Sequence, residues 1–299
     1  MKKSQGEGIF LTIGHIIILF CALCAVIPII LIVISSFTDN DTLIRNGYAF
    51  FPEKWSTYAY HYVFNSGNSV VHAYGISFLL TIAGTALSLA VTTSLAYVIS
   101  KKDLPGKGIL VFLVFFTLLF NGGLVPTYMV YTRIFHVKNT FWGLLFPNLL
   151  MNGFNVLLMK SYFVTNVPGE ILEAAYIDGS GEFRTFFQIA VPLAKPIIAT
   201  IGIFSGIAYW NDWMNGYIYL TKRTDLYSIQ NLLNRMIQNI QYLSQNATVI
   251  ANANAGLATI PAVSVRMAMA VLGILPVVVI YPFIQNNFVK GITLGGIKG

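Results

Sequence analysis

Charged residues are scarce in this chain of 299 residues, in which Asp, Glu, Lys and Arg together make up 10%. Apolar residues make up 56%, and the mean hydropathy is +0.70. This balance excludes an ordinary soluble domain and predicts a polytopic membrane protein. The net charge of +7 does not indicate nucleic acid, because the basic residues are scattered at the ends of apolar runs. We therefore expect membrane lipid, and no nucleic acid, around the chain.

Residue patterns for catalysis or metal binding are also lacking. Cys21 and Cys24 lie inside the first apolar run without His or further Cys at ligand spacing, so we interpret them as small core residues and expect no metal. The sequence contains no Ser-His-Asp set, H-E-x-x-H or nucleophile elbow. Gly106-Lys107 lacks the earlier glycine of a phosphate-binding loop. The sequence thus predicts no catalytic site and no cofactor bound by this chain.

Long apolar runs are what the sequence has instead, and they predict an all-α protein with six transmembrane helices, at about residues 9–34, 74–99, 109–125, 141–163, 197–218 and 265–283. The first run is too long for a signal-peptide core. A basic turn at Lys101, Lys102 and Lys107 and the short N-terminal flank favour cytoplasmic termini, although the overall charge asymmetry is weak. Before the last run, a helical apolar stripe predicts an amphipathic helix on the outer surface (Leu226, Ile229, Leu233, Met236, Ile237 and Ile240).

A polar island from Pro168 to Pro196 separates two of these runs. It holds four of the eleven acidic residues (Glu170, Glu173, Asp178 and Glu182). In a chain so poor in charge, this clustering indicates a segment that lies in water against something that recognises it. The alternative is an ordinary polar loop with a helical hairpin.

Local signals in the island predict two short helices joined by a sharp turn. Thr165 or Asn166 can cap the first helix, and Pro168 suits its opening turn. Gly179 is expected to end it at positive φ. Ser180 would then cap a second helix that Pro192 stops and that carries an aromatic and apolar face (Phe183, Phe186, Phe187 and Ile189).

The same residues fit the pattern E-A-A-x3-G-x9-I-x-L-P at Glu173, Ala174, Ala175, Gly179, Ile189 and Pro192, with Val191 in place of leucine. In this the sequence resembles the membrane permeases of binding-protein-dependent ABC importers. The resemblance implies that residues 166–195 are a coupling loop that docks on a cytoplasmic ATPase. It marks Glu173 and Gly179 as the most sensitive positions, and Asp178 lies beside them in the same loop.

Further stretches, including F-N-G-G-L-V-P-T-Y at 120–128 and Y-W-N-D-W at 209–213, resemble maltose-type carbohydrate permeases, in the LplC-like branch for complex oligosaccharides. The resemblance covers essentially the whole chain and implies a type I ABC importer permease fold, with one transmembrane domain over 1–299 in a bacterial cytoplasmic membrane. It also implies a second, homologous permease in a heterodimer, two ATP-binding subunits that use ATP and Mg, and an extracytoplasmic solute-binding protein. The tail at 289–299 either reaches those ATPases or is a frayed end.

Polar residues inside apolar runs are costly, so they tend to face the bundle interior or an aqueous cavity. Asn148, Asn152 and Asn155 have the spacing i, i+4, i+7 of one helical face. Their uncharged amides match a neutral, hydroxyl-rich solute. Interhelical hydrogen bonding explains the stripe equally well.

A second polar group follows in the fifth run, at Tyr209, Trp210, Asn211 and Asp212. It is interpreted either as a sugar pathway or as an interfacial aromatic belt. Gly202 and Gly206, lower in the same run, indicate close helix packing.

The leading hypothesis is one permease half of an ABC sugar importer. A permease for another solute is an alternative. An ion-coupled secondary transporter is a weaker one, since Asp212 alone offers an acidic group within the spans. An intramembrane enzyme would need paired catalytic residues, which the sequence lacks.

Overall fold

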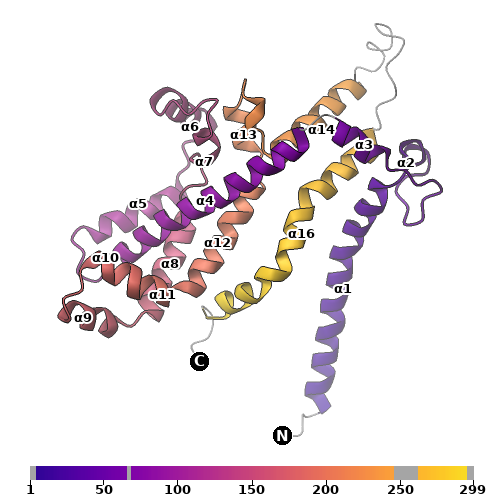
Figure 1. The fold of residues 1–299 in the computed structure, drawn as a ribbon. Coiled ribbons are helices and arrows are strands. Elements are labelled where there is room, and N and C mark those ends of the chain that lie inside the picture. The colour runs from indigo at the N-terminus through magenta and orange to yellow at the C-terminus, as the bar shows by residue number, and fades with distance from the viewer. Residues whose placement is uncertain (1–4, 66–68, 246–261, 295–299) are drawn as a thin grey trace. The chain divides into compact units, whose positions relative to one another are not determined.

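The computed structural model describes residues 5–65, 69–245 and 262–294, and these ranges are built from helices and the turns between them (Figure 1). Extended pairing in the described ranges is limited to one bridge between Thr38 and Trp55. The all-α class is therefore confirmed. The chain divides into two compact units, Met1–Val70 with Arg235–Pro276 and Val71–Asn234 with Val277–Gly299. A single transmembrane domain over 1–299 stays a prediction.

The first unit contains α1 (Gln5–Ser36), α2 (Asn40–Asn46), α3 (Tyr58–Asn65), the second half of α14 (Ile229–Gln245) and the first half of α16 (Ala262–Leu294). The end of α1 is tied to α3, because Ser36 Oγ lies 2.8 Å from Tyr60 Oη. Cys21 and Cys24 are free and exposed, since the apolar stretch of α1 is not covered by other described residues. Their interpretation as core residues is wrong for the isolated chain.

The second unit consists of α4 (Ser69–Ser100), α5 (Lys107–Leu119), α6 (Leu124–Met129), η1 (Val130–Ile134), α7 (Trp142–Leu145), α8 (Gly153–Asn166), α9 (Gly169–Ile177), α10 (Glu182–Thr185), η2 (Phe186–Ala190), α11 (Val191–Leu193), α12 (Lys195–Trp210), α13 (Met214–Tyr219), η3 (Thr224–Leu226), the start of α14 and the second half of α16. Within this unit, α9, α10 and α11 lie at one end of α4, and α6, α7 and α13 lie toward the other end (Figure 1). The expected amphipathic helix is present as α14, with Ile229, Leu233 and Ile240 buried and Leu226 in the turn before it.

Three described helices are long and apolar enough to cross a membrane, at Phe10–Ser36, Val70–Ser100 and Val263–Pro282. The number rises to five if two bent pairs each count as one span, Lys107–Leu119 with Leu124–Ile134 (118°) and Glu182–Leu193 with Lys195–Trp210 (81°). The count of six spans and the cytoplasmic position of both termini stay predictions. In the tail, residues 289–294 continue α16, and residues 295–299 lie outside the described ranges.

The third, fourth and fifth runs do not form the continuous helices that we expected. The third breaks at residues 120–123, where Gly123 has a φ of +82° and Asn121 Oδ1 accepts a hydrogen bond from Gly123 N (2.8 Å). The fourth is interrupted between α7 and α8, around Pro147, and the fifth is interrupted between α12 and α13. Average hydropathy missed these breaks because each holds only a few polar, proline or glycine residues between longer apolar stretches.

Glycines allow α12 to approach α4 closely. A Cβ on Gly202 would lie 3.3 Å from Leu89 Cδ1, and a Cβ on Gly206 would lie 3.5 Å from Thr85 Oγ1, so the packing role expected for these glycines agrees with the structure. On the α4 side, a Cβ on Gly84 would come within 2.5 Å of the ring of Tyr209. Tyr209 is buried and donates a hydrogen bond to Leu145 O (2.9 Å), so its ring has little freedom to retreat.

We therefore expect Gly84→Ala to destabilise the protein by about 1–3 kcal/mol, the usual range for overpacking a tight core. The measurement is thermal unfolding of the protein purified in detergent. Gly75→Ala is the matched control, because Gly75 lies in the same helix and a Cβ added there would have nothing within 4 Å. Equal midpoints for the two variants would contradict the close approach at Gly84.

Candidate functional site

The turn at Gly179 is the sharpest feature of the polar island. Gly179 has a φ of +80°, as expected, directly after Asp178, the C-cap residue of α9. Ser180 N donates to Ala175 O (2.9 Å), and Gly179 N donates to Tyr176 O (3.0 Å). This pair of hydrogen bonds is the Schellman arrangement, which satisfies carbonyl groups at a helix end and reverses the chain direction. The island is therefore two short helical segments joined by a fixed turn.

The N-terminal caps expected for the two helices of the island are wrong. Thr165 and Asn166 belong to the last turn of α8, and Pro168 occupies the cap position of α9. Gly181, not Ser180, precedes α10, while the Ser180 hydroxyl accepts a hydrogen bond from Thr185 Oγ1 (3.1 Å). The second segment continues through the π-helical turn η2 and ends at Leu193, one residue beyond Pro192.

The residues of the E-A-A pattern are mostly open to solvent. Glu173, Ala174, Asp178, Gly179 and Pro192 are exposed, Ile189 is half-buried, and Ala175 is buried. Two aromatic side chains of the second segment project outward, with Phe183 82% exposed and Phe187 63% exposed. The loop thus presents small, acidic and aromatic groups together on an uncovered surface.

The base of the loop is packed firmly on the helices beside it. Phe186 is buried against the ring of Tyr97 in α4 (4.9 Å between centroids), and Tyr97 also contacts Phe163 in α8 (5.7 Å). These rings belong to a larger core that includes Ala190, Ile197 and other buried residues of α4, α5, α8 and α12. The loop is therefore not a mobile appendage but an extension of the helix bundle.

Lys101, which the sequence indicated only as part of a basic turn, reaches this loop. Its ammonium donates hydrogen bonds to Glu182 Oε2 and to Tyr176 Oη (3.2 Å). The hydrogen bond from Lys101 lowers the pKa of Glu182. Partial burial works to lower the pKa of Lys101, but its hydrogen bonds to Glu182 and Tyr176 outweigh that effect and raise it. The pair is charged at neutral pH.

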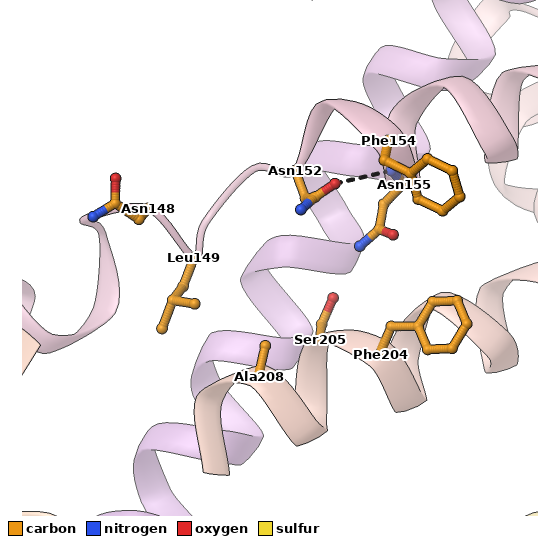
Figure 2. A pocket seen from close by; sticks show the side chains of 8 residues that line it. All are labelled: Asn148, Leu149, Asn152, Phe154, Asn155, Phe204, Ser205 and Ala208. Carbon is orange, nitrogen blue, oxygen red and sulfur yellow. Dashed lines mark hydrogen bonds between the residues drawn. The ribbon is translucent and has the colours of Figure 1, made fainter. Parts of the chain in front are cut away.

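A second candidate site is a partly open cavity of about 480 Å³ between α8 and α12 (Figure 2). Its lining contains all three predicted asparagines together with residues that the sequence did not single out (Asn148, Leu149, Asn152, Phe154, Asn155, Phe204, Ser205 and Ala208). Ser205 Oγ lies 3.3 Å from Ser88 Oγ of α4, so the cavity wall is also tied to that helix. The one local signal for the missed residues was a serine, Ser205, within an apolar run.

The three asparagines do not form one helical stripe. Asn148 lies in a turn with a φ of +63°, which asparagine tolerates better than most residues. Asn152 precedes α8 and accepts a hydrogen bond from Asn155 N (3.2 Å), so it caps the helix (Figure 2). Asn155 is 7% exposed in the first turn of α8. All three residues line one cavity because a break, not a continuous helix, brings them there.

The aromatic group at 209–212 serves mainly in packing and capping. Tyr209 and Trp210 are buried, and Trp210 lies 5.3 Å from Phe78 and 6.3 Å from Tyr74 in α4. Asp212 Oδ1 accepts hydrogen bonds from the first N–H groups of α13, and Asn211 is exposed. None of these four residues lines the cavity described above. In the described ranges, no three His, Cys, Asp or Glu side chains gather as metal ligands.

Comparison with known proteins gives a consistent picture. Residues 108–294 match the family described as "Binding-protein-dependent transport system inner membrane component". The chain is 33% identical to the polygalacturonan/rhamnogalacturonan transport system permease protein YtcP of Bacillus subtilis over 282 residues, 94% of this chain and 96% of that protein. It is 32% identical to protein LplC of the same organism, over 92% of this chain and 90% of that one.

A solved structure supports the same grouping. It is a bacterial ABC transporter involved in the import of the acidic polysaccharide alginate. The match has a TM-score of 0.79 at 26% sequence identity and covers 96% of this chain and 99% of that chain. The likeness thus extends over the helices of both candidate sites.

The capping role of Asn152 predicts that Asn152→Ala lowers the stability of the protein by about 1 kcal/mol, because an N–H group at the start of α8 loses its acceptor. Asn152→Ser keeps a short acceptor and is expected to retain most of that stability. Thermal unfolding in detergent measures both variants. Equal losses for alanine and serine would show that the cap does not hold the start of α8.

Proposed function

Since the chain belongs to the family of binding-protein-dependent transport system inner membrane components, we propose that it forms one half of the translocation pathway of an ABC importer for oligosaccharides. It is a multi-pass permease of the cytoplasmic membrane. Two of the relatives named above carry carbohydrates in their names, one polygalacturonan or rhamnogalacturonan and the other alginate. Their shared chemistry supports a sugar as the solute.

The partners follow from this assignment. A second, homologous permease completes the pathway as a heterodimer, an extracytoplasmic solute-binding protein delivers the sugar, and two separate subunits bind and hydrolyse ATP with Mg. This chain itself performs no chemistry. Closure of the ATP-binding subunits would push the coupling loops of the two permeases together, and the helices would carry this movement into a switch from inward-facing to outward-facing.

The observation that carries the proposal is the geometry of the loop at residues 166–195. It has an exposed acidic residue at Glu173, small side chains at Ala174 and Gly179, and the protruding ring of Phe183. It is also packed by Phe186 on the bundle. A surface of this kind suits docking in a groove of another subunit, and its rigid base suits the transmission of a displacement.

The cavity at Asn148, Asn152 and Asn155 supports a hydroxyl-bearing solute. Its polar groups are amides and a serine hydroxyl, and Phe154 and Phe204 supply aromatic faces. Amides donate and accept hydrogen bonds without placing a charge in the membrane. A permease for another solute is the alternative. An ion-coupled transporter is disfavoured, because Asp212 accepts N–H groups of α13 and so has a structural role.

The coupling role predicts that Gly179→Val disrupts docking, because a branched side chain at a φ of +80° is strained by more than about 1 kcal/mol and re-aims the second segment. The measurement is the amount of ATPase subunit that co-purifies with tagged permease in mild detergent, together with sugar uptake in liposomes. Both are expected to fall.

Gly181→Val is the matched control for that experiment. Gly181 is also exposed and also has nothing within 4 Å of an added Cβ, but its φ is −72°, which valine adopts freely. Wild-type ATPase content and uptake in the Gly179 variant would show that the loop does not couple.

The cavity predicts a different phenotype for Asn155→Leu. Losing one hydrogen bond to the solute is expected to lower uptake by about threefold to tenfold. The complex should still assemble and still hydrolyse ATP. Uptake and ATP hydrolysis measured side by side separate the two interpretations, since loss of assembly would indicate interhelical packing at Asn155 instead of solute contact.

A further inference from the structure

One ammonium group joins the coupling loop to a helix that is not its neighbour in sequence. Lys101, just beyond the end of α4, contacts Glu182 in the second helical segment and Tyr176 in the first. Tyr176 also donates to the same carboxylate oxygen (2.9 Å), so the acid bridges both segments to the lysine. The end of α4 and both helical segments of the loop thus meet at one ion pair.

Two aromatic rings restrain the position of the Lys101 ammonium. The Lys101 ammonium lies 4.8 Å from the ring centre of Tyr97 and 5.7 Å from that of Tyr176, and the two tyrosine hydroxyls are 3.3 Å apart. A cation held over rings and bonded to a carboxylate has less freedom than one in an exposed pair. The Lys101 side chain is 27% exposed, although that of Glu182 is 62% exposed. The turn is further held by Lys107, whose ammonium donates to Lys101 O (2.7 Å).

The connectivity of the chain makes this link significant. The loop is covalently continuous with α8 on one side and α12 on the other, so any displacement of the loop acts on those helices directly. α4 has no such connection, because Lys101 and Glu182 are 81 residues apart. Yet α4 packs against Gly202 and Gly206 of α12 and contributes Ser88 beside the cavity, so it must move in step with α12.

We propose that Lys101 is a positioning residue that transmits movement of the coupling loop to α4 through Glu182 and Tyr176. This inference rests on the proposed coupling role of the loop. The aromatic contact of Tyr97 with Phe186 brings α4 against the loop, and the lysine sets the angle at which they meet. Without the lysine, the loop still docks on the ATP-binding subunits, but its displacement reaches α4 only through side-chain packing.

The test uses the complete transporter in liposomes and measures ATPase content, ATP hydrolysis and sugar uptake. Lys101→Met and Glu182→Gln are each expected to keep wild-type ATPase content and hydrolysis while uptake per ATP falls by about fivefold or more, the low end of typical couplings between sites. The double variant should be no worse than either single one, since both remove the same contact. Lys101→Arg, which keeps the charge, should retain most of the wild-type sugar uptake per ATP.

Lys102→Met is the control, because Lys102 is exposed at the next position and is expected to leave the ratio unchanged. Wild-type uptake per ATP in Lys101→Met, alongside failure of Gly179→Val, would overturn this inference and leave the coupling role intact. Loss of ATPase subunits from Lys101→Met would also overturn it, because the lysine would then serve assembly. Wild-type behaviour of Gly179→Val itself would instead reject the coupling role on which the inference rests.

Discussion

Backbone N–H and C=O groups inside a membrane have no water to bond, so every interruption of a spanning helix must be satisfied by the protein or face a cavity. This constraint explains why polar side chains lie at the helix breaks of the second unit. Asn121 bonds the backbone at the break after α5, Asn152 bonds the start of α8, and Asp212 bonds the start of α13. Asn215 adds a hydrogen bond to Pro147 O (2.9 Å), which joins two of the breaks. The polar residues of the apolar runs are therefore in large part the means by which those runs are interrupted.

Part of this architecture could be predicted from the sequence alone. The helical class, the long helices α1, α4 and α16 and the turn at Gly179 follow from hydropathy and from one glycine, which are local signals. The three asparagines line one cavity, but the assumed helix gave them the wrong geometry, and their role in a solute pathway stays a prediction. Pro147 and Gly153 were signals for the break, since proline and glycine weaken helices, but the apolar residues between them outweighed these signals in the prediction.

Contacts between distant segments were beyond prediction from one sequence. Nothing near Lys101 indicates that its partner is Glu182, and nothing near Tyr209 indicates that its hydroxyl donates to Leu145 O. Such pairs depend on which helices pack together. That packing is decided here by small residues such as Gly84, Gly202 and Gly206, which have no side chain to reveal the face they serve.

The two candidate sites lie on one pair of helices. α8 starts directly after Asn152, carries Asn155 at the cavity, and ends at Asn166, where the proposed coupling loop begins. α12 begins at Lys195, where the loop ends, and brings Ser205 to the same cavity. At a rise of about 1.5 Å per residue, α8 spans about 20 Å between the two sites. Because both walls of the cavity are continuous with the loop, a displacement of the loop would move both walls, and α4 contacts the two ends of this assembly through Ser88 and Lys101.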